Sequence, residues 1–189
     1  MQLETQLKAQ LTPHRYKHSL SVAQLAASWA PRMKLEPKRV WIAGLLHDCA
    51  HDLPGSVLLQ KSEEFGILIG SMERKLPFLL HGPVGAQLAK RDYGITDPLI
   101  LDAIHHHTTG IPGMCPFSRL ICLADYLEPS RSFPGIEHLR RLARRNLDQA
   151  LLAAFDSTIK YLLENEKLVH PQTILTRNWL LEFLKEVRG

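Results

Sequence analysis

A histidine and an aspartate, His47 and Asp48, stand side by side directly after an apolar helical run at residues 40–46. Burying an imidazole and a carboxylate without partners is costly, so an apolar segment rarely ends in this pair unless something compensates both groups. A bound metal ion compensates both at once. Further side chains of ligand type are spread along the chain, as expected of ligands that converge from several helices: His18, His81, His107 and Asp125.

The ligand types favour a divalent first-row ion. Two imidazoles and two carboxylates are available in His18, His47, Asp48 and Asp125, and no thiolate belongs to this set. The missing thiolate argues against a structural zinc site, and mixed nitrogen and oxygen ligation suits iron or manganese, although such sites often accept other ions. Such an ion lowers the pKa of its bound water and so supplies a nucleophile near neutral pH.

The elements that must position these residues are predicted to be helices throughout, because apolar residues recur at helical spacing. We therefore predict an all-α fold, a compact helical bundle that forms a single domain over residues 1–189. The metal-site core lies at about 13–135, and C-terminal helices at about 136–189 pack on it. The expected helices are 13–29, 37–49, 55–65, 81–91, 98 into 105–110, 116–126, 134–166 (one bent helix or two) and 173–187.

The composition is that of an ordinary globular protein, with 189 residues, 45% of them hydrophobic and 22% charged. A net charge of +4 suits polyanionic small molecules and is too small to indicate a nucleic-acid partner. The three cysteines form no closely spaced pair, which argues against disulfides and favours a reducing cytoplasm. Without a signal pattern or a membrane-spanning run, we expect a cytoplasmic protein with no membrane partner, and a homodimer stays open.

The order His…His-Asp…His…His…Asp resembles that of the HD-domain superfamily of metal-dependent phosphohydrolases. The chain is most similar to the bacterial HD-type symmetrical diadenosine tetraphosphate hydrolases, the YqeK-type family. The most specific signature is His-Thr-Thr-Gly at 107–110 followed by Ala-Asp-Tyr-Leu-Glu-Pro at 124–129. The resemblance runs from about residue 13 to 182. Further matching stretches are 18–20 with 22–23, 43–48, 80–82, 103–104, Arg131, 170–171, Thr173 and 177–178.

The resemblance implies a ligand set for the main iron, which consists of His18, His47, Asp48 and Asp125. It also implies that His81 and His107 face the same pocket. There they hold a second ion bridged by Asp48 or contact substrate phosphates directly, and the sequence does not choose between one ion and two. Because neighbours on a helix lie about 100° apart, the adjacent His105 and His106 are expected to serve other purposes than His107.

The activity that the resemblance implies is hydrolysis of diadenosine tetraphosphate to two ADP, with attack of metal-bound hydroxide on an inner phosphorus. The substrate class is dinucleoside polyphosphates, with an ADP- or GDP-like product. Asp48 and Asp52 are the candidate catalytic carboxylates. Asp52 follows the His-Asp pair by four residues, and it either orients the attacking water or a ligand histidine or merely begins the turn at 52–55.

Six residues are candidates for contacts with substrate: Ser21, His51, Asp52, Thr108, Arg131 and Arg177. Arg131 follows the metal ligand Asp125 past a proline turn and is the first candidate for a phosphate clamp, because its planar fork matches phosphate oxygens. Ser21 shares a helical face with His18 and is either a phosphate contact or a plain helix serine. Arg177 either lines the nucleotide end of the pocket or ties the last helix to the core.

His51 departs from the family pattern, in which we expect lysine two places before Leu53-Pro54. If this position touches phosphate, its charge depends on pH near 6.5, so a permanent cationic contact is lost there. The basic run Arg140, Arg141, Arg144 and Arg145 is interpreted as a solvated helix face. The alternatives to the favoured activity are an HD phosphohydrolase for another nucleotide, a non-catalytic nucleotide sensor, and an RNA-binding scaffold that uses this run.

Overall fold

The computed structural model describes residues 2–187, and no strand occurs in that range, which confirms the all-α prediction. Two 3₁₀ turns, η1 (Ala30–Met33) and η2 (Pro77–Leu80), join the helices. The helices are α1 Gln2–Gln10, α2 Pro13–Trp29, α3 Pro37–Leu46, α4 Gly55–Glu64, α5 Ser71–Lys75, α6 His81–Asp92, α7 Pro98–His106, α8 Pro116–Leu127, α9 Ile136–Arg145, α10 Leu147–Glu164 and α11 Pro171–Glu186. The three cysteines are free, as expected.

Proline at the first position begins α2, α3, α7, α8 and α11. Its missing N–H costs nothing there, because a helix leaves its first N–H groups unpaired. Polar side chains pair some of the remaining groups: Thr12 Oγ1 accepts the Arg15 N–H at 3.3 Å, and the Asp97 carboxylate accepts that of Leu99 at 3.0 Å. These prolines, together with side-chain caps at α2, α3 and α7, explain why the sequence located the starts of α2, α3, α7 and α8 correctly.

Some boundaries differ from the prediction. The helix expected to reach residue 49 ends at Leu46, because the backbone continues in tighter turns, with the Cys49 N–H donating to the Leu46 carbonyl at 3.0 Å. The stretch 134–166 forms two helices, because Asn146 has an extended backbone and its side chain caps α10. The last helix begins at Pro171 rather than at 173. The short α1 and α5 were not predicted.

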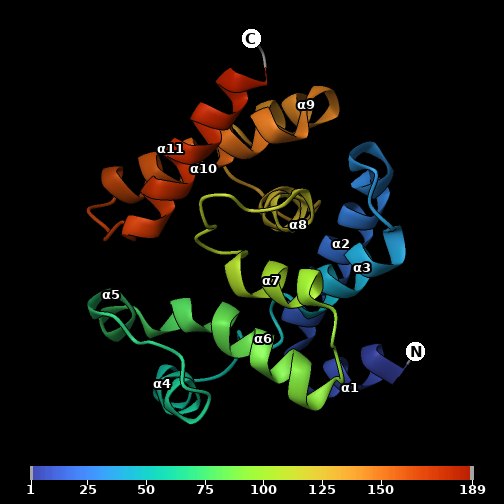
Figure 1. Cartoon of the computed structure of the whole chain (residues 1–189), viewed down its shortest axis with the longest axis vertical. Helices are drawn as coiled ribbons and strands as arrows, with labels where there is room; N and C mark the ends of the chain where they lie inside the picture. The colour runs from blue at the N-terminus through green and yellow to red at the C-terminus, as the bar shows by residue number, and fades with distance from the viewer. Residues whose placement is uncertain (1, 188–189) are drawn as a thin grey trace.

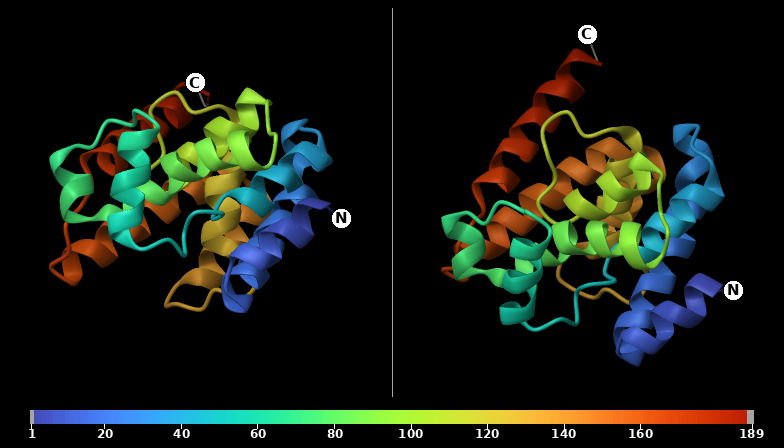
Figure 2. Two further views of the ribbon diagram at one scale, coloured as in Figure 1. Left: turned by 90° about the horizontal axis from the view of Figure 1, so that it is seen from below. Right: turned by 60° about the horizontal axis from the view of Figure 1, so that its bottom comes forward.

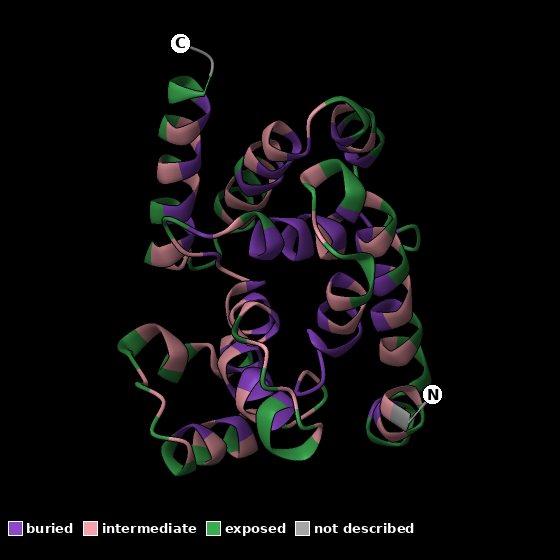
Figure 3. Ribbon diagram, turned by 45° about the vertical axis from the view of Figure 1, so that its right-hand side comes forward, coloured by how far each residue is buried: buried purple, intermediate pink, exposed green. Residues whose placement is uncertain are grey.

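Helix α8 lies at the centre of the molecule, where it contacts α2, α3, α7, α9 and α10 (Figure 1). Nine of its 12 residues are buried, and it stands out as a buried helix in Figure 3. α10 packs on α8 and α11 packs on α10, whereas α1 and α11 lie at opposite edges (Figure 2). None of the described helices combines the length and the apolar character needed to cross a membrane.

Candidate metal centre

Five segments of the fold bring the six predicted ligand residues to one place beside α8. All of them are buried except Asp125, whose side chain is partly exposed at 21%. They are His18 in α2, His47 and Asp48 directly after α3, His81 at the start of α6, His107 directly after α7 and Asp125 in α8. Four of the ligands therefore sit at helix ends, and His18 and Asp125 sit within α2 and α8, where packing fixes their backbones.

The close packing of α2 against α3 sets the distance between the first two histidines. Gly44 lies against the backbone of Ala23, and a Cβ at Gly44 would come within 2.7 Å of Ala23 Cα. Only glycine allows this approach without a shift of the helices. As a result, the rings of His18 and His47 lie with their centroids 5.2 Å apart.

The carboxylate of Asp48 lies between two pairs of histidines. Its Oδ1 is 3.3 Å from His81 Nε2 and 3.4 Å from His107 Nε2. Its Oδ2 is 3.4 Å from His47 Nε2 and 3.6 Å from His18 Nε2. One side chain thus links the four rings, and each of its oxygens serves one pair.

All four histidines direct Nδ1 away from Asp48, toward an oxygen acceptor. The pairs, with their N···O distances, are His18 with Glu128 Oε1 (3.2 Å), His47 with the Gly44 carbonyl (2.8 Å), His81 with the Phe78 carbonyl (2.5 Å) and His107 with the Ile104 carbonyl (2.8 Å). Because these oxygens only accept, each Nδ1 carries the proton and donates it. Each Nε2 therefore faces the centre, and in the neutral ring its lone pair points there, which is the arrangement of a metal-ligating histidine.

These inward lone pairs fit a metal ion. His18 Nε2 and His47 Nε2 are buried, and neither finds a hydrogen-bond partner within residues 2–187. His81 Nε2 and His107 Nε2 lie 2.9 Å apart, and the Thr108 hydroxyl can donate to only one of them. A divalent ion would accept lone pairs of this kind, and two ligands of one ion at about 2.1 Å are separated by about 3 Å.

Asp125 lies close to His18 and His47 and can share a metal ion with them. Its Oδ1 lies 3.0 Å from His18 Nε2 and 3.7 Å from His47 Nε2. The ligand atoms of these three residues lie within 4.8 Å of one another, and so do those of His47, Asp48 and His107. Five of the six predicted ligands therefore form two overlapping groups that share His47, and His81 lies beside Asp48 and His107.

The electrostatics of the centre favour a cation. Burial opposes a charge on His47, but Asp48 and Asp125 outweigh it and raise the pKa of His47 to about 10. Burial also acts against the two carboxylates, yet the surrounding histidines hold the pKa of Asp48 and of Asp125 well below the usual range. Both carboxylates are therefore ionised near neutral pH, and their negative field attracts a proton or a metal ion.

The structure adds Glu128, which the sequence analysis treated only as part of a motif. This side chain is fully buried, and besides the His18 ring it accepts the Ser130 N–H at 2.8 Å and the Ser130 hydroxyl at 2.5 Å. Burial raises its pKa, but hydrogen bonds from Ser130, Ser21 and His18 prevail and lower it. An ionised Glu128 behind His18 orients that ring. The available signal was the position three residues after Asp125, on the same helical face.

Arg15 is the second residue that sequence reasoning missed. Its Nη1 donates to Asp48 Oδ2 at 2.7 Å, and its Nε lies 3.9 Å from Asp52 Oδ1. The signal was again helical spacing, because Arg15 precedes His18 by three residues.

Several predicted substrate contacts lie around the centre. Arg131 Nη2 donates to Asp125 Oδ1 at 2.7 Å, and Thr108 lies beside the rings of His81 and His107 as described above. The His51 ring lies 5.0 Å from the His81 ring, between centroids. Asp52 accepts the Thr12 N–H at 2.8 Å and ties the 47–52 segment to the start of α2.

Two other candidates lie differently. Arg177 donates from Nε to Asp156 Oδ1 at 2.7 Å, which ties α11 to α10, the second of the two roles expected from the sequence. Ser21 faces Glu128. Their contacts with substrate stay predictions.

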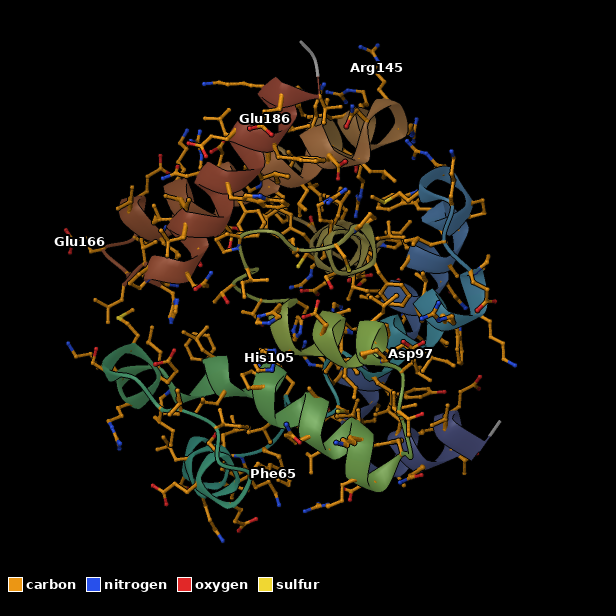
Figure 4. All side chains as sticks on the ribbon, viewed as in Figure 1. Phe65, Asp97, His105, Arg145, Glu166 and Glu186 are labelled. Atoms are coloured by element: carbon orange, nitrogen blue, oxygen red, sulfur yellow. The ribbon has the colours of Figure 1, made fainter. Side chains whose placement is uncertain are left out.

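The basic run on α9 differs from a plain solvated face at one position. Arg140 donates to the carbonyls of Leu127, Glu128 and Arg131, and so holds the loop that carries Glu128 and Arg131. The other three arginines are exposed, and Figure 4 shows Arg145 pointing outward from the end of α9.

Residues 15–130 match the HD domain family. The chain is 39% identical to a symmetrical bis(5'-nucleosyl)-tetraphosphatase of Bacillus subtilis, covering 93% of this chain and 94% of the relative. It is 35% identical to the enzyme of that name from Halalkalibacterium halodurans, over 93% of each chain. A crystal structure described as a "predicted HD superfamily hydrolase involved in NAD metabolism", from Clostridium acetobutylicum, matches with a TM-score of 0.92 and 39% identity over 96% of each chain.

Proposed function

The chain belongs to the HD-domain family, in the branch of the symmetrical bis(5'-nucleosyl)-tetraphosphatases, and on this premise we propose that it cuts diadenosine tetraphosphate into two ADP. The observation that carries the proposal is the ring of four histidines, whose Nε2 atoms surround the carboxylate of Asp48. The identity to the named relatives extends over nearly the whole chain, so the helices that surround the centre are included in the likeness.

We assign the main ion, iron, to the group His18, His47, Asp48 and Asp125. We assign a second ion to His81 and His107, with Asp48 contributing to both. The support for the second ion is the 2.9 Å separation of the two Nε2 atoms, which face each other although both rings donate their Nδ1 proton elsewhere. When bound, a divalent ion lowers the pKa of water and neutralises phosphate charge.

The side chains around the ions have separate roles in binding and orientation. Asp48 lies between the two pairs of histidines and contributes an oxygen to each, and Glu128 keeps the His18 lone pair directed inward. Arg131 supplies permanent positive charge for a phosphate group of the leaving ADP. Asp52 is ionised, because hydrogen bonds from Thr12 outweigh burial and lower its pKa, and we assign it to orienting the attacking water.

Product analysis tests the proposal. The purified protein, reconstituted with iron or manganese, is incubated with diadenosine tetraphosphate, with other dinucleoside polyphosphates and with alarmones, and the products are separated by chromatography. We expect ADP as the sole product of the tetraphosphate. ATP together with AMP would contradict symmetrical cleavage, and turnover of an alarmone but not of the tetraphosphate would assign the centre to another nucleotide.

A further inference from the structure

Arg15 stands at the edge of the metal centre with part of its guanidinium unused. Nη1 is bound to Asp48, and the Nε atom is buried and finds no hydrogen-bond partner among the described residues. The side chain as a whole is 18% exposed, so part of it reaches solvent. A buried N–H without an acceptor is costly, and the planar fork of arginine is suited to the oxygens of a phosphate group.

The surroundings hold Arg15 in this position. It lies in the first turn of α2, three residues before His18, so both side chains share one helical face. Asp52 fixes the same turn, because its carboxylate accepts the backbone N–H of Thr12 and lies 3.9 Å from Arg15 Nε. The guanidinium is therefore placed in advance of ligand binding, which reduces the entropy that a phosphate contact costs.

Two guanidinium groups, those of Arg15 and Arg131, lie beside the carboxylates of the centre. Arg131 is bound to Asp125 and Arg15 is bound to Asp48, so one guanidinium stands beside each carboxylate ligand. A tetraphosphate that is cut in the middle must be held by two phosphate groups on each side of the broken bond. Resting on the function proposed above, we propose that Arg15 binds a phosphate group of one ADP half, while Arg131 serves the other half.

Binding of ADP tests this role separately from turnover. The manganese-loaded wild type, Arg15→Gln and Arg15→Lys are titrated with ADP by calorimetry, metal content is measured by mass spectrometry, and KM and kcat are measured with diadenosine tetraphosphate. Arg141→Gln, on the exposed face of α9, is the matched control. We expect Arg15→Gln to weaken ADP binding and to raise KM by about 10- to 100-fold at unchanged metal content. The ADP affinity and KM of Arg15→Lys should lie between those of the wild type and Arg15→Gln, because lysine keeps the charge and loses the planar fork.

Two results would overturn the role of Arg15. One is ADP affinity within about twofold of wild type in Arg15→Gln. The other is a loss of ADP affinity that follows a loss of metal in both variants, because Arg15 would then only support Asp48. If the wild type leaves diadenosine tetraphosphate intact while Arg15→Gln still weakens ADP binding, the proposed activity is wrong and the phosphate contact stands.

Discussion

Replacing Glu128 by glutamine keeps the volume of the side chain and removes the carboxylate behind His18. Glu128 Oε1 accepts from His18 and from the Ser130 hydroxyl, and Oε2 accepts the Ser130 N–H. A glutamine has only one acceptor oxygen, so its NH₂ group must face either the His18 Nδ1 proton or the Ser130 N–H. With the NH₂ group toward His18, the buried ring donor loses its acceptor, which costs about 1–3 kcal/mol; with it toward Ser130, a neutral amide oxygen replaces the carboxylate behind the ring.

When the NH₂ group faces His18, the ring must turn or move its proton to Nε2. Either response weakens the coordination of the metal by His18 Nε2. Changes of this kind behind a ligand reduce metal affinity about 10- to 100-fold, or about 1.4–2.8 kcal/mol. Calorimetric titration of Glu128→Gln with Mn²⁺ measures the effect. Glu164→Gln is the control, because Glu164 is an exposed residue of α10 whose ion pair with Lys160, at 3.7 Å, is also exposed. Wild-type manganese affinity in Glu128→Gln would refute the idea that this carboxylate orients His18.

Three further predictions follow from the geometry. Asp48→Ala should lower kcat by about 10³-fold or more, roughly 4 kcal/mol, together with metal content, and an Asp48→Ala enzyme with normal turnover and metal content contradicts its role. Because the carboxylates raise the pKa of His47, a proton competes with the metal, so metal affinity should rise with pH by up to about tenfold per unit. Calorimetry in buffers of different ionisation enthalpy should detect the released proton, and pH-independent affinity contradicts this. Gly110→Ala should lower the free energy of unfolding by about 1–3 kcal/mol more than Gly66→Ala in urea titrations. Both glycines have positive φ, but a Cβ at Gly110 meets Thr176 Cγ2 at 2.4 Å and a Cβ at Gly66 meets nothing within 4 Å, so equal losses contradict the packing argument.

The helices were predictable because their signals are local. Proline after a polar cap marks the starts of α2, α3 and α7, and a cap residue acts on N–H groups two or three positions away. The break at Asn146 carried a signal of the same kind, since asparagine is a strong cap, but the amphipathic pattern continues across it and hides the boundary. The end of α3 had no such signal, because the tight turns after Leu46 keep the chain coiled.

The ligand residues were predictable from their types and order, whereas the contacts that their supporting side chains make across the fold were not. The Glu128 carboxylate that orients His18 lies 110 residues away along the chain, and no local pattern relates the two. Arg15 lies near His18 in sequence, yet its partner Asp48 comes from the end of another helix. For Arg177 the sequence left two roles open, and only the packing of α11 on α10 shows its contact with Asp156.

Anomalous diffraction from crystals grown with manganese tests most directly whether these side chains bind a metal ion together. We expect a manganese peak at about 2.0–2.3 Å from Nε2 of His18 and of His47, with carboxylate oxygens of Asp48 and Asp125 completing the contacts. A peak elsewhere on the molecule, or Asp125 turned away from the His47-Asp48 pair with no peak between them, would contradict the account.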